Sequence, residues 1–201
     1  MVERRDDIGA TTVSAEIADW SREKPRQFWD PSRKLLLAIR RYQHWRNKKG
    51  IIAACACKWC VLRHRFWSIV TGAEIPLNCR IGGGLRINHP NGVVIHPEAA
   101  IGVNCQIFQQ VTITNDDKGR GFPEIAGHVD IGAGAKVLGP IKIGAHAKIG
   151  ANSLVITDVP AGATAVGVPA RILPGSITAT ERSVRSISTL NNSPPGMRDA
   201  E

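Results

Sequence analysis

Two histidine–proline pairs lie within one short stretch of the chain, at His89-Pro90 and His96-Pro97. The ordinary pKa of a histidine side chain is about 6.5, so at neutral pH it can accept a proton and act as a general base. A histidine can equally be an ordinary surface residue. Which pair could do chemistry depends on the element that positions each of them.

A six-residue repeat predicts that element. An aliphatic residue opens almost every hexad, at positions 75, 81, 87, 95, 101, 107, 113, 125, 131, 137, 143, 149 and 155. A period of six fits neither an α-helix nor an alternating strand. It fits a coil with three flat faces, in which the aliphatic side chains point to the axis and glycine allows the turn at a corner. We therefore predict a mainly β fold, a parallel β-helix or prism of about four coils.

Two breaks interrupt the repeat. We assign the first to Val93-Val94, two residues that shift the frame just after His89. The second is the polar stretch of residues 114–124, which lacks an inward aliphatic residue and is expected to leave the prism as an extruded loop. His89 therefore lies beside a break, whereas His96 occupies the second position of a regular hexad and is expected to be structural.

The chain divides into three parts. Residues 1–72 contain a polar arm and a helical segment, because residues 31–70 have helical periodicity that Gly50 interrupts. We expect this α-helical segment to be a small cap or an oligomerisation element. Residues 73–173 form the β-helix, and residues 174–201, rich in Ser, Thr, Pro and Asn, are expected to be a flexible tail.

The formal net charge is +9, and most of it lies in the amino-terminal part. The sequence shows neither zinc-finger spacing nor an RNA-binding aromatic motif, so we expect no nucleic acid partner. A basic surface also suits an anionic membrane, and we consider peripheral membrane contact through the basic helices. The first residues lack the apolar run of a signal peptide, and no stretch approaches about 20 apolar residues, so we expect a cytoplasmic protein.

Three of the five cysteines, Cys55, Cys57 and Cys60, form a C-x-C-x-x-C cluster. Together with His64 they could bind a metal ion, but on one short helix their side chains would point to different faces. We therefore expect free structural thiols in a reducing compartment, and no metal.

Four strings, INHPNGVVI, FQQVTI, IGAGAKVLGPIKIGAHAKIGANSLV and DVPAGATAVGVPARI, resemble the serine O-acetyltransferases among the hexapeptide-repeat, acyl-CoA-dependent transferases. The resemblance implies a left-handed β-helix and a homotrimer with active sites between neighbouring prisms. It also implies acetyl transfer from acetyl-CoA to the hydroxyl group of L-serine, a step of cysteine biosynthesis. Pairing of two trimers is left open, because the helical segment is short.

The same resemblance assigns the catalytic residues. The family histidine falls on His89, which would remove the hydroxyl proton so that the alkoxide attacks the thioester. An acidic residue fifteen positions earlier orients that histidine in the family, and Glu74 holds this position. A carboxylate there would fix the tautomer and stabilise the imidazolium. Asn88 replaces the family aspartate that meets the amino group of the substrate.

For the donor, small side chains in the GAGAK and GANS turns would let backbone amides approach a ligand. The resemblance places these residues along the pantetheine arm of acetyl-CoA: Ala133, Gly134, Lys148 and Ala151. Three further residues could meet the phosphates of CoA: Lys136, Lys142 and Arg171.

The extruded loop departs from the family pattern. Where the family has D-R-H-P, with the Arg and His gripping the carboxylate of the substrate, this chain has Arg120-Gly121-Phe122-Pro123. Arg120 could still reach a carboxylate from a shifted position, whereas Phe122 replaces the histidine. A site that loses the partners of a charged group binds that group less well. A sugar hydroxyl of a surface polysaccharide or glycan precursor is therefore an alternative acceptor.

Two rival interpretations remain. A zinc hydro-lyase of the γ-carbonic anhydrase type would need His89, His96 and His128 as three converging ligands, but the histidine spacing and the GVPAR ending argue against it. The outward hexad positions of His128 and His146 predict surface residues. A non-catalytic trimeric scaffold would explain the altered loop, but His89 with Glu74 fifteen residues before it argues against that role.

Overall fold

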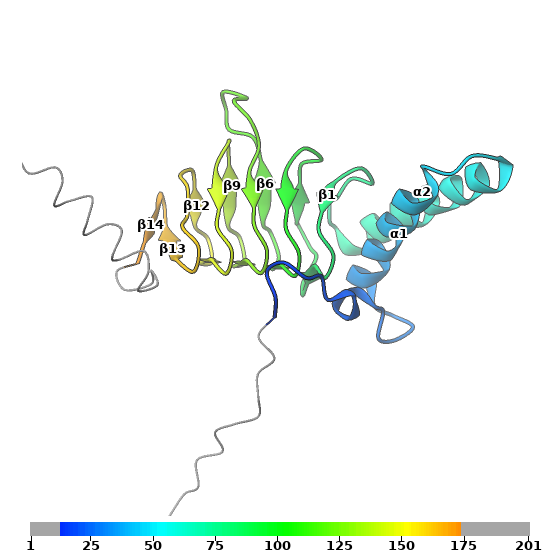
Figure 1. Cartoon of the computed structure of the whole chain (residues 1–201), viewed down its shortest axis with the longest axis horizontal. Helices are drawn as coiled ribbons and strands as arrows, with labels where there is room; N and C mark the ends of the chain where they lie inside the picture. The colour runs from blue at the N-terminus through cyan, green and yellow to red at the C-terminus, as the bar shows by residue number, and fades with distance from the viewer. Residues whose placement is uncertain (1–12, 174–201) are drawn as a thin grey trace, which may run out of the picture.

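The computed structural model describes residues 13–173, so the expected tail lies outside the described residues. A helical hairpin is followed by a three-sided stack of coils (Figure 1). The hairpin consists of α1 (Pro31–Trp45) and α2 (Ile51–Thr71), and a short 3₁₀ helix, η1 (Trp20–Glu23), precedes it. None of the helices in the described part combines the length and the hydropathy that crossing a bilayer requires.

Local sequence explains the ends of the helices. Pro31 starts α1, because proline has its fixed φ at a position where no backbone N–H is needed. Gly50 precedes α2 with a φ of 106°, and Gly72 ends it in the left-handed conformation with a φ of 64°. The predicted periodicity over residues 31–70 is confirmed, with Leu35, Leu36 and Ile39 buried.

Three sheets form the faces of the prism. The first sheet contains β1 (Arg80–Ile81), β4 (Ala100–Ile101), β7 (Glu124–Ile125) and β10 (Lys142–Ile143). The second sheet contains β2 (Arg86–Ile87), β5 (Gln106–Ile107), β8 (Asp130–Ile131), β11 (Lys148–Ile149), β13 (Thr164–Gly167) and β14 (Ala170–Ile172). The third sheet contains β3 (Val94–Ile95), β6 (Thr112–Thr114), β9 (Lys136–Leu138) and β12 (Leu154–Val155). All pairs are parallel except β13–β14, which confirms the predicted parallel β-helix.

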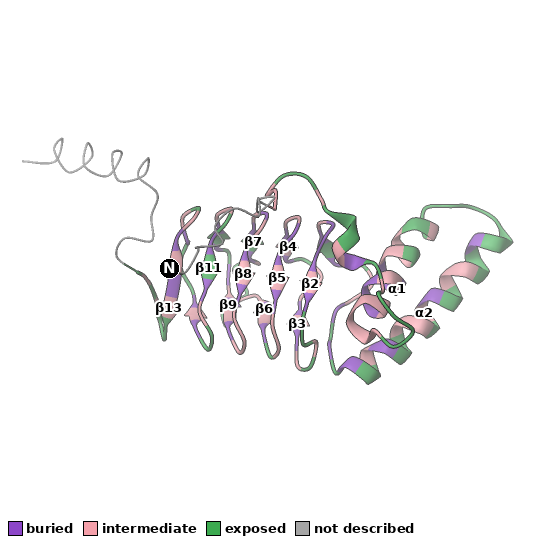
Figure 2. Cartoon of the chain, turned by 90° about the horizontal axis from the view of Figure 1, so that it is seen from below, coloured by how far each residue is buried: buried purple, intermediate pink, exposed green. Residues whose placement is uncertain are grey.

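The core is the column of aliphatic side chains that the repeat predicts. All thirteen hexad-opening residues are buried, and the most exposed of them, Ile81, has 8% of its surface accessible. Figure 2 shows this burial recurring from strand to strand along the prism. Burial of an Ile or Val side chain contributes roughly 1.5–3 kcal/mol, so the column is the main source of stability of this otherwise turn-rich structure.

The coils turn at three edges, which we number by the sheets they join. Edge 1 joins the first and second sheets, edge 2 the second and third, and edge 3 the third and first. Left-handed residues make the corners, with Asn104, His128 and His146 on edge 1 and Gln110 and Asn152 on edge 2. A positive φ is expensive for most residues, and Asn and His are among those that tolerate it best.

The prediction that Val93-Val94 is the two-residue insertion is wrong. Val93 is fully buried, as Val111 is one coil later, and Val94 pairs with Thr112 in regular register. Between β2 and β3 the two extra residues are therefore His89 and Pro90. They lie at edge 2, where a lengthened corner projects from the prism without disturbing the core.

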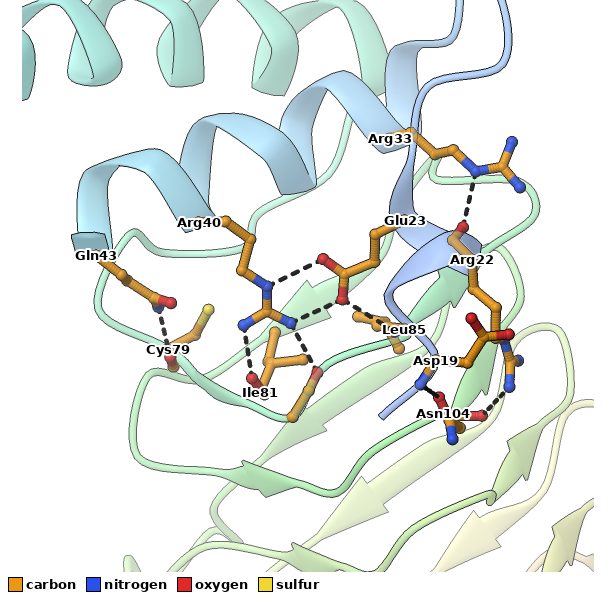
Figure 3. A network of polar contacts seen from close by, with 11 residues as sticks. Asp19, Arg22, Glu23, Arg33, Arg40, Gln43, Cys79, Ile81, Leu85 and Asn104 are labelled. Carbon is orange, nitrogen blue, oxygen red and sulfur yellow. Dashed lines mark hydrogen bonds and ion pairs between the residues drawn. The ribbon is translucent and has the colours of Figure 1, made fainter. Parts of the chain in front are cut away.

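The described part of the amino-terminal arm packs against edge 1 through residues 14–22. The Asn104 side chain accepts a hydrogen bond from the Asp19 amide at 2.8 Å and donates to the carbonyl oxygens of Ser14 and Ile17, each at 2.7 Å. Arg22 donates to the Asn104 carbonyl at 2.8 Å (Figure 3). The buried Asn104 side chain thus satisfies backbone groups of the arm that no strand pairs with.

Candidate active site

Edge 2 lines up a row of predicted site residues. His89, Ala133 and Ala151 belong to corners of different coils of this edge, and Gln109 fills the corner between His89 and Ala133. The corners are hydrogen bonded to one another: Gly134 donates to the Gln109 carbonyl at 2.8 Å, and Asn152 to the Ala133 carbonyl at 2.7 Å. Adjacent coils are about 4.8 Å apart, so this row is a narrow, regular track that starts at His89.

His89 is the free histidine of this edge. Its side chain is exposed, and within residues 13–173 its ring makes no hydrogen bond, ion pair or aromatic contact. The neighbouring Asn88 is also exposed, while its amide donates to the Ile107 carbonyl at 3.3 Å. The backbone of the corner is therefore anchored to the next coil, and the imidazole is available to an incoming molecule.

Glu74 lies one coil outside His89, where it is stacked on Val94 of β3. Its amide donates to the Val93 carbonyl at 2.8 Å and its carbonyl accepts from the Ile95 amide at 3.0 Å, which adds it to the outer coil of the third sheet. The exposed carboxylate has no partner in the described part of the chain, and it lines a groove of about 480 Å³ together with His64 and Pro76. The structure therefore brings Glu74 near edge 2 without a direct bond to His89.

His96 has the structural role that its hexad position predicts. It lies at edge 3, where its Nδ1 is 3.2 Å from the amide of Glu98, which donates to it. Its ring is stacked on Phe122, with centroids 4.1 Å apart and planes inclined by 13°. Phe122 of the altered loop is thus engaged with His96 on one face, and this pair holds the end of the loop against the prism.

Arg120 is held by an acidic residue of its own loop. Its Nε donates to Oδ2 of Asp116 at 2.6 Å, and its amide donates to Oδ1 at 3.0 Å. These hydrogen bonds from Arg120 keep the pKa of Asp116 below its ordinary value. The Arg120 side chain remains 63% exposed, so the rest of its guanidinium group can still meet an anion.

The loop and His89 lie at different edges of one prism. Residues 115–123 leave the third sheet at edge 3, after β6, and project away from the stack (Figure 1). The third sheet separates them from the corner that carries His89. Arg120 and Phe122 therefore do not flank His89 of the same chain.

The predicted donor-site lysines point out of three different sheets. Lys136 in β9 and Lys148 in β11 belong to the two sheets that meet at edge 2. The Lys136 ammonium group donates to the Gln110 carbonyl at 2.8 Å and to Oγ1 of Thr112 at 3.0 Å, whereas the Lys148 side chain is exposed. Lys142 in β10 is on the first sheet, which faces away from edge 2.

Two further features lie away from the corners of edge 2. Arg171 is exposed in β14, opposite Val166 of β13, beyond the corner that holds Ala151. A groove of about 840 Å³ runs over the outer face of the first sheet and is lined by Lys142, among other residues. The first sheet thus offers a hollow surface of its own.

Sequence reasoning missed Gln109. Its Oε1 is buried and, among the described residues, has no hydrogen-bond partner, although it lies between the corners of His89 and Ala133. The FQQVTI string contains this residue, but a glutamine at a turn has no property that would distinguish it before the coils are stacked. An unsatisfied buried acceptor is costly, so this atom is a candidate acceptor for a donor outside the described residues.

The zinc interpretation fails on geometry within one chain. His89 lies at edge 2, His96 at edge 3 and His128 at edge 1, where Nδ1 of His128 is 2.8 Å from Nδ1 of His146. Burial and the neighbouring His146 lower the pKa of His128. In residues 13–173 no group of three or more His, Cys, Asp or Glu side chains is placed to hold a metal ion.

The cysteine cluster does not share one face of α2. Cys55 is exposed and Cys60 is buried, while Nε2 of His64 lies 2.8 Å from the carbonyl of Ile75. In the prism, burial raises the pKa of Cys79 and of Cys105 to about 11. These buried thiols pack in the core and are poor nucleophiles at neutral pH.

Comparison with known proteins identifies what the prism resembles. No protein-family model matches the chain. It is 46% identical to the serine acetyltransferase of Synechococcus elongatus over 107 residues. The matched region covers 52% of this chain and 44% of the relative. The chain is 47% identical over 129 residues to that of Staphylococcus aureus, covering 63% and 58%. The chain thus spans about half the length of the curated relatives it matches.

Solved structures give the same result. The soybean serine acetyltransferase apoenzyme has a TM-score of 0.60 and 37% identity, over 71% of this chain and 57% of that one. A serine acetyltransferase in complex with CoA has a TM-score of 0.60 and 33% identity, over 73% and 58%. Sequence and fold therefore agree on the relationship of the β-helix.

Proposed function

We propose that this chain, whose β-helix is similar in sequence and fold to serine acetyltransferases, belongs to that family and transfers an acetyl group from acetyl-CoA to the hydroxyl group of L-serine. The acetyl donor is the co-substrate, and no metal takes part. The free thiols among the described residues agree with a cytoplasmic location for this reaction.

The availability of His89 carries this proposal. The other histidines on or against the prism are engaged, because His96 is stacked on Phe122, His128 is paired with His146, and His64 contacts a carbonyl oxygen. Only His89 projects from a corner that the insertion has lengthened, at the start of the edge 2 track. An exposed imidazole can reach a substrate hydroxyl group and return its proton during the same turnover.

The reaction uses this imidazole twice. His89 takes the proton of the serine hydroxyl as the oxygen attacks the carbonyl carbon of the thioester. The tetrahedral intermediate then expels the CoA sulfur, which takes the proton back from the imidazolium, giving O-acetylserine and CoA. Glu74, stacked on the strand that follows the His89 corner, orients the imidazole and stabilises its charged form, after a side-chain rotation that its exposed position allows.

The track on edge 2 suits the donor. We place the thioester at His89 and the pantetheine arm along the corners of Ala133, Gly134 and Ala151, whose small side chains leave the backbone accessible. Lys148, next to this edge, Lys136 and Arg171 at the far end would meet the phosphates. Asn88 beside the base would contact the acceptor.

A homotrimer with the site between neighbouring prisms accounts for the residues that one chain keeps apart. Arg120 and Phe122 at edge 3 and Lys142 on the first sheet cannot join edge 2 of their own prism. The groove of about 840 Å³ on the first sheet is a surface against which edge 2 of a neighbouring prism, with its bound donor, would fit. In that arrangement one chain supplies the base, and the next supplies the loop and Lys142.

The test is release of CoA thiol from acetyl-CoA in the presence of L-serine, homoserine, or sugar and glycan acceptors. Thiol release with L-serine, and O-acetylserine in the products by mass spectrometry, is the expected result. Turnover with a sugar but not with serine would identify a sugar hydroxyl as the acceptor instead of L-serine. The altered residues Asn88 and Phe122 are the reason to include this acceptor. If no hydroxyl acceptor supported turnover, the result would favour the non-catalytic scaffold role instead.

A further inference from the structure

Helix α2 exposes a continuous apolar stripe that the prism does not use. Ile52, Trp59, Leu62, Phe66 and Ile69 are 79%, 58%, 59%, 52% and 84% exposed. With the exposed Cys55 they recur at alternating spacings of three and four residues, which keeps them on one face of a helix. The buried residues Ala53, Cys60 and Trp67 lie on another face, so the stripe is not the side that packs in the hairpin.

Aromatic side chains widen the stripe on one side. A groove of about 590 Å³ is lined by Phe28 and Trp29 of the segment before α1, by Trp59 and Phe66 of α2, and by the basic residues Lys34 and Arg63. Phe28 is 90% exposed and Trp29 is 56% exposed. Exposed large apolar and aromatic side chains gathered on one surface are typical of a site of contact.

The charge around this surface is mostly positive, with the exposed Glu74 beside Arg65 and Ile69 as an acidic residue at one end. Residues 31–73 contain no Asp or Glu. They contain ten basic residues: Arg33, Lys34, Arg40, Arg41, Arg46, Lys48, Lys49, Lys58, Arg63 and Arg65. Two of these form ion pairs among the described residues, Arg33 with Asp30 and Arg40 with Glu23. Whatever covers the stripe therefore meets a strongly positive rim.

That rim disfavours a second copy of the same helix. At the positions that flank the stripe, α2 carries Lys58 and Arg65 on one side and Arg63 on the other, with no acidic residue to pair with them. Two such helices packed together would place like charges opposite each other, which is destabilising. The complementary surface is one that combines negative charge with an apolar layer beneath it.

We propose that the outer face of α2, with the neighbouring Phe28 and Trp29, binds an anionic lipid surface. The stripe would lie at the boundary between headgroups and acyl chains, with its aromatic rings in the interface and its Lys and Arg side chains toward the lipid phosphates. The helix lies on the bilayer and does not cross it, in agreement with its inability to span one. This location is independent of which hydroxyl the enzyme acetylates.

Vesicle co-sedimentation of the full chain tests the proposal. We expect binding to vesicles of phosphatidylcholine mixed with phosphatidylglycerol, little binding to phosphatidylcholine alone, and release at high salt because the charges are exposed. Lys58→Glu should weaken binding on the order of tenfold, since each basic residue near an anionic surface contributes about a fivefold change in affinity. Trp59→Ser combined with Phe66→Ser should weaken it at least as much.

Matched controls separate the stripe from overall charge. Lys118→Glu makes the same charge change at an exposed site of the loop between β6 and β7 and should leave vesicle binding within about twofold, because that loop projects from the prism away from the hairpin (Figure 1). Thiol release with L-serine in solution should be unchanged by Lys58→Glu, so failure of the catalytic proposal would be visible separately.

Three results would overturn the lipid proposal. The first is equal sedimentation with neutral and anionic vesicles. The second is an equal effect of Lys118→Glu and Lys58→Glu. The third is a particle mass, measured by sedimentation velocity without lipid, that falls by half in the Trp59→Ser, Phe66→Ser variant, because the stripe would then be covered by a second copy of the chain.

Discussion

Arg40 connects α1, the amino-terminal arm and the first coil, and its replacement by methionine should unfold this junction. Its guanidinium group donates to the carbonyl oxygens of Ile81 and Gly82, each at 2.7 Å, and to both carboxylate oxygens of Glu23, at 2.8 and 3.0 Å (Figure 3). Oε1 of Glu23 also accepts the Leu85 amide at 3.1 Å. Methionine keeps much of the volume of the side chain but none of its donors.

The magnitude follows from burial. The side chains of Arg40 and Glu23 are 18% and 7% exposed, so this pair is nearly removed from water. Removing one partner of a buried ion pair costs about 3–5 kcal/mol, because the other charge is left buried and unpaired. Arg40→Met should therefore lower the free energy of unfolding of the junction by about 3–5 kcal/mol. A double variant that adds Glu23→Gln should recover part of this loss, because it removes the stranded charge and can still accept from Leu85.

Tryptophan fluorescence in urea is the suitable assay. All five tryptophans lie between residues 20 and 67, so fluorescence follows the arm and the hairpin, while far-ultraviolet circular dichroism also follows the prism. Trp20 is a direct reporter, since the Arg40 guanidinium lies 5.2 Å from the centroid of its ring. Urea is preferable to guanidinium chloride because it does not screen the ion pair.

Two results would refute the reasoning. One is a fluorescence transition of Arg40→Met within about 1 kcal/mol of the wild type, which would mean that the pair is solvated or replaceable. The other is additivity of the Arg40→Met and Glu23→Gln effects, since residues in one network should show coupling of about 0.5–3 kcal/mol.

Three further predictions concern thiols, pH and the donor site. Cys55 should be alkylated at once in the folded protein and Cys105 only after unfolding, because burial raises the pKa of Cys105 to about 11; rapid labelling of Cys105, mapped by mass spectrometry, would contradict this. The folded-state pKa of His128 is lowered, so the unfolded chain binds more protons as pH falls through about 6.5 and stability should decline there. His128→Asn, which tolerates the left-handed corner, should flatten this decline in the thermal midpoint, and an unchanged pH profile would exclude His128 as its source. Lys148→Ala and Lys142→Ala should each weaken CoA binding by about fivefold in calorimetry, and an unchanged affinity for Lys142→Ala would remove the first sheet from the donor site.

Periodicity carried most of the information about the fold. The aliphatic residues that open the hexads specify the core directly, because a side chain at the axis of a narrow prism has only one environment. Gly50 and Gly72 likewise mark the ends of α2, since each takes a positive φ there. The same patterns locate His96, whose regular hexad position predicts the corner role that its contact with Phe122 confirms.

What the repeat could not predict lies where chain segments meet. The frame shift before Ile95 shows that two residues are inserted, but only strand register shows that they are His89 and Pro90 rather than Val93 and Val94. The packing of the arm on Asn104 and the unpartnered Oε1 of Gln109 depend on contacts between residues far apart in sequence. The repeat pattern within one segment does not predict such long-range contacts.

The separation of the site residues is of the same kind. The loop follows His89 closely enough in sequence to suggest a shared cleft, yet each coil turns through three edges before it returns. Arg120 therefore projects from edge 3 and Lys142 from the first sheet, while His89 projects from edge 2. A motif assigned residue by residue lists these groups together, whereas the coil geometry distributes them over different surfaces of the prism.

The role of His89 is tested most directly by the kcat/KM of His89→Gln for L-serine at saturating acetyl-CoA. His44→Gln is the matched control, since His44 is an exposed histidine of α1 away from edge 2. Loss of the base should lower kcat/KM by about 10²–10⁴-fold, with CoA affinity retained and the control unchanged. Wild-type turnover in His89→Gln, in protein shown to be folded, would contradict the assignment of His89 as the general base.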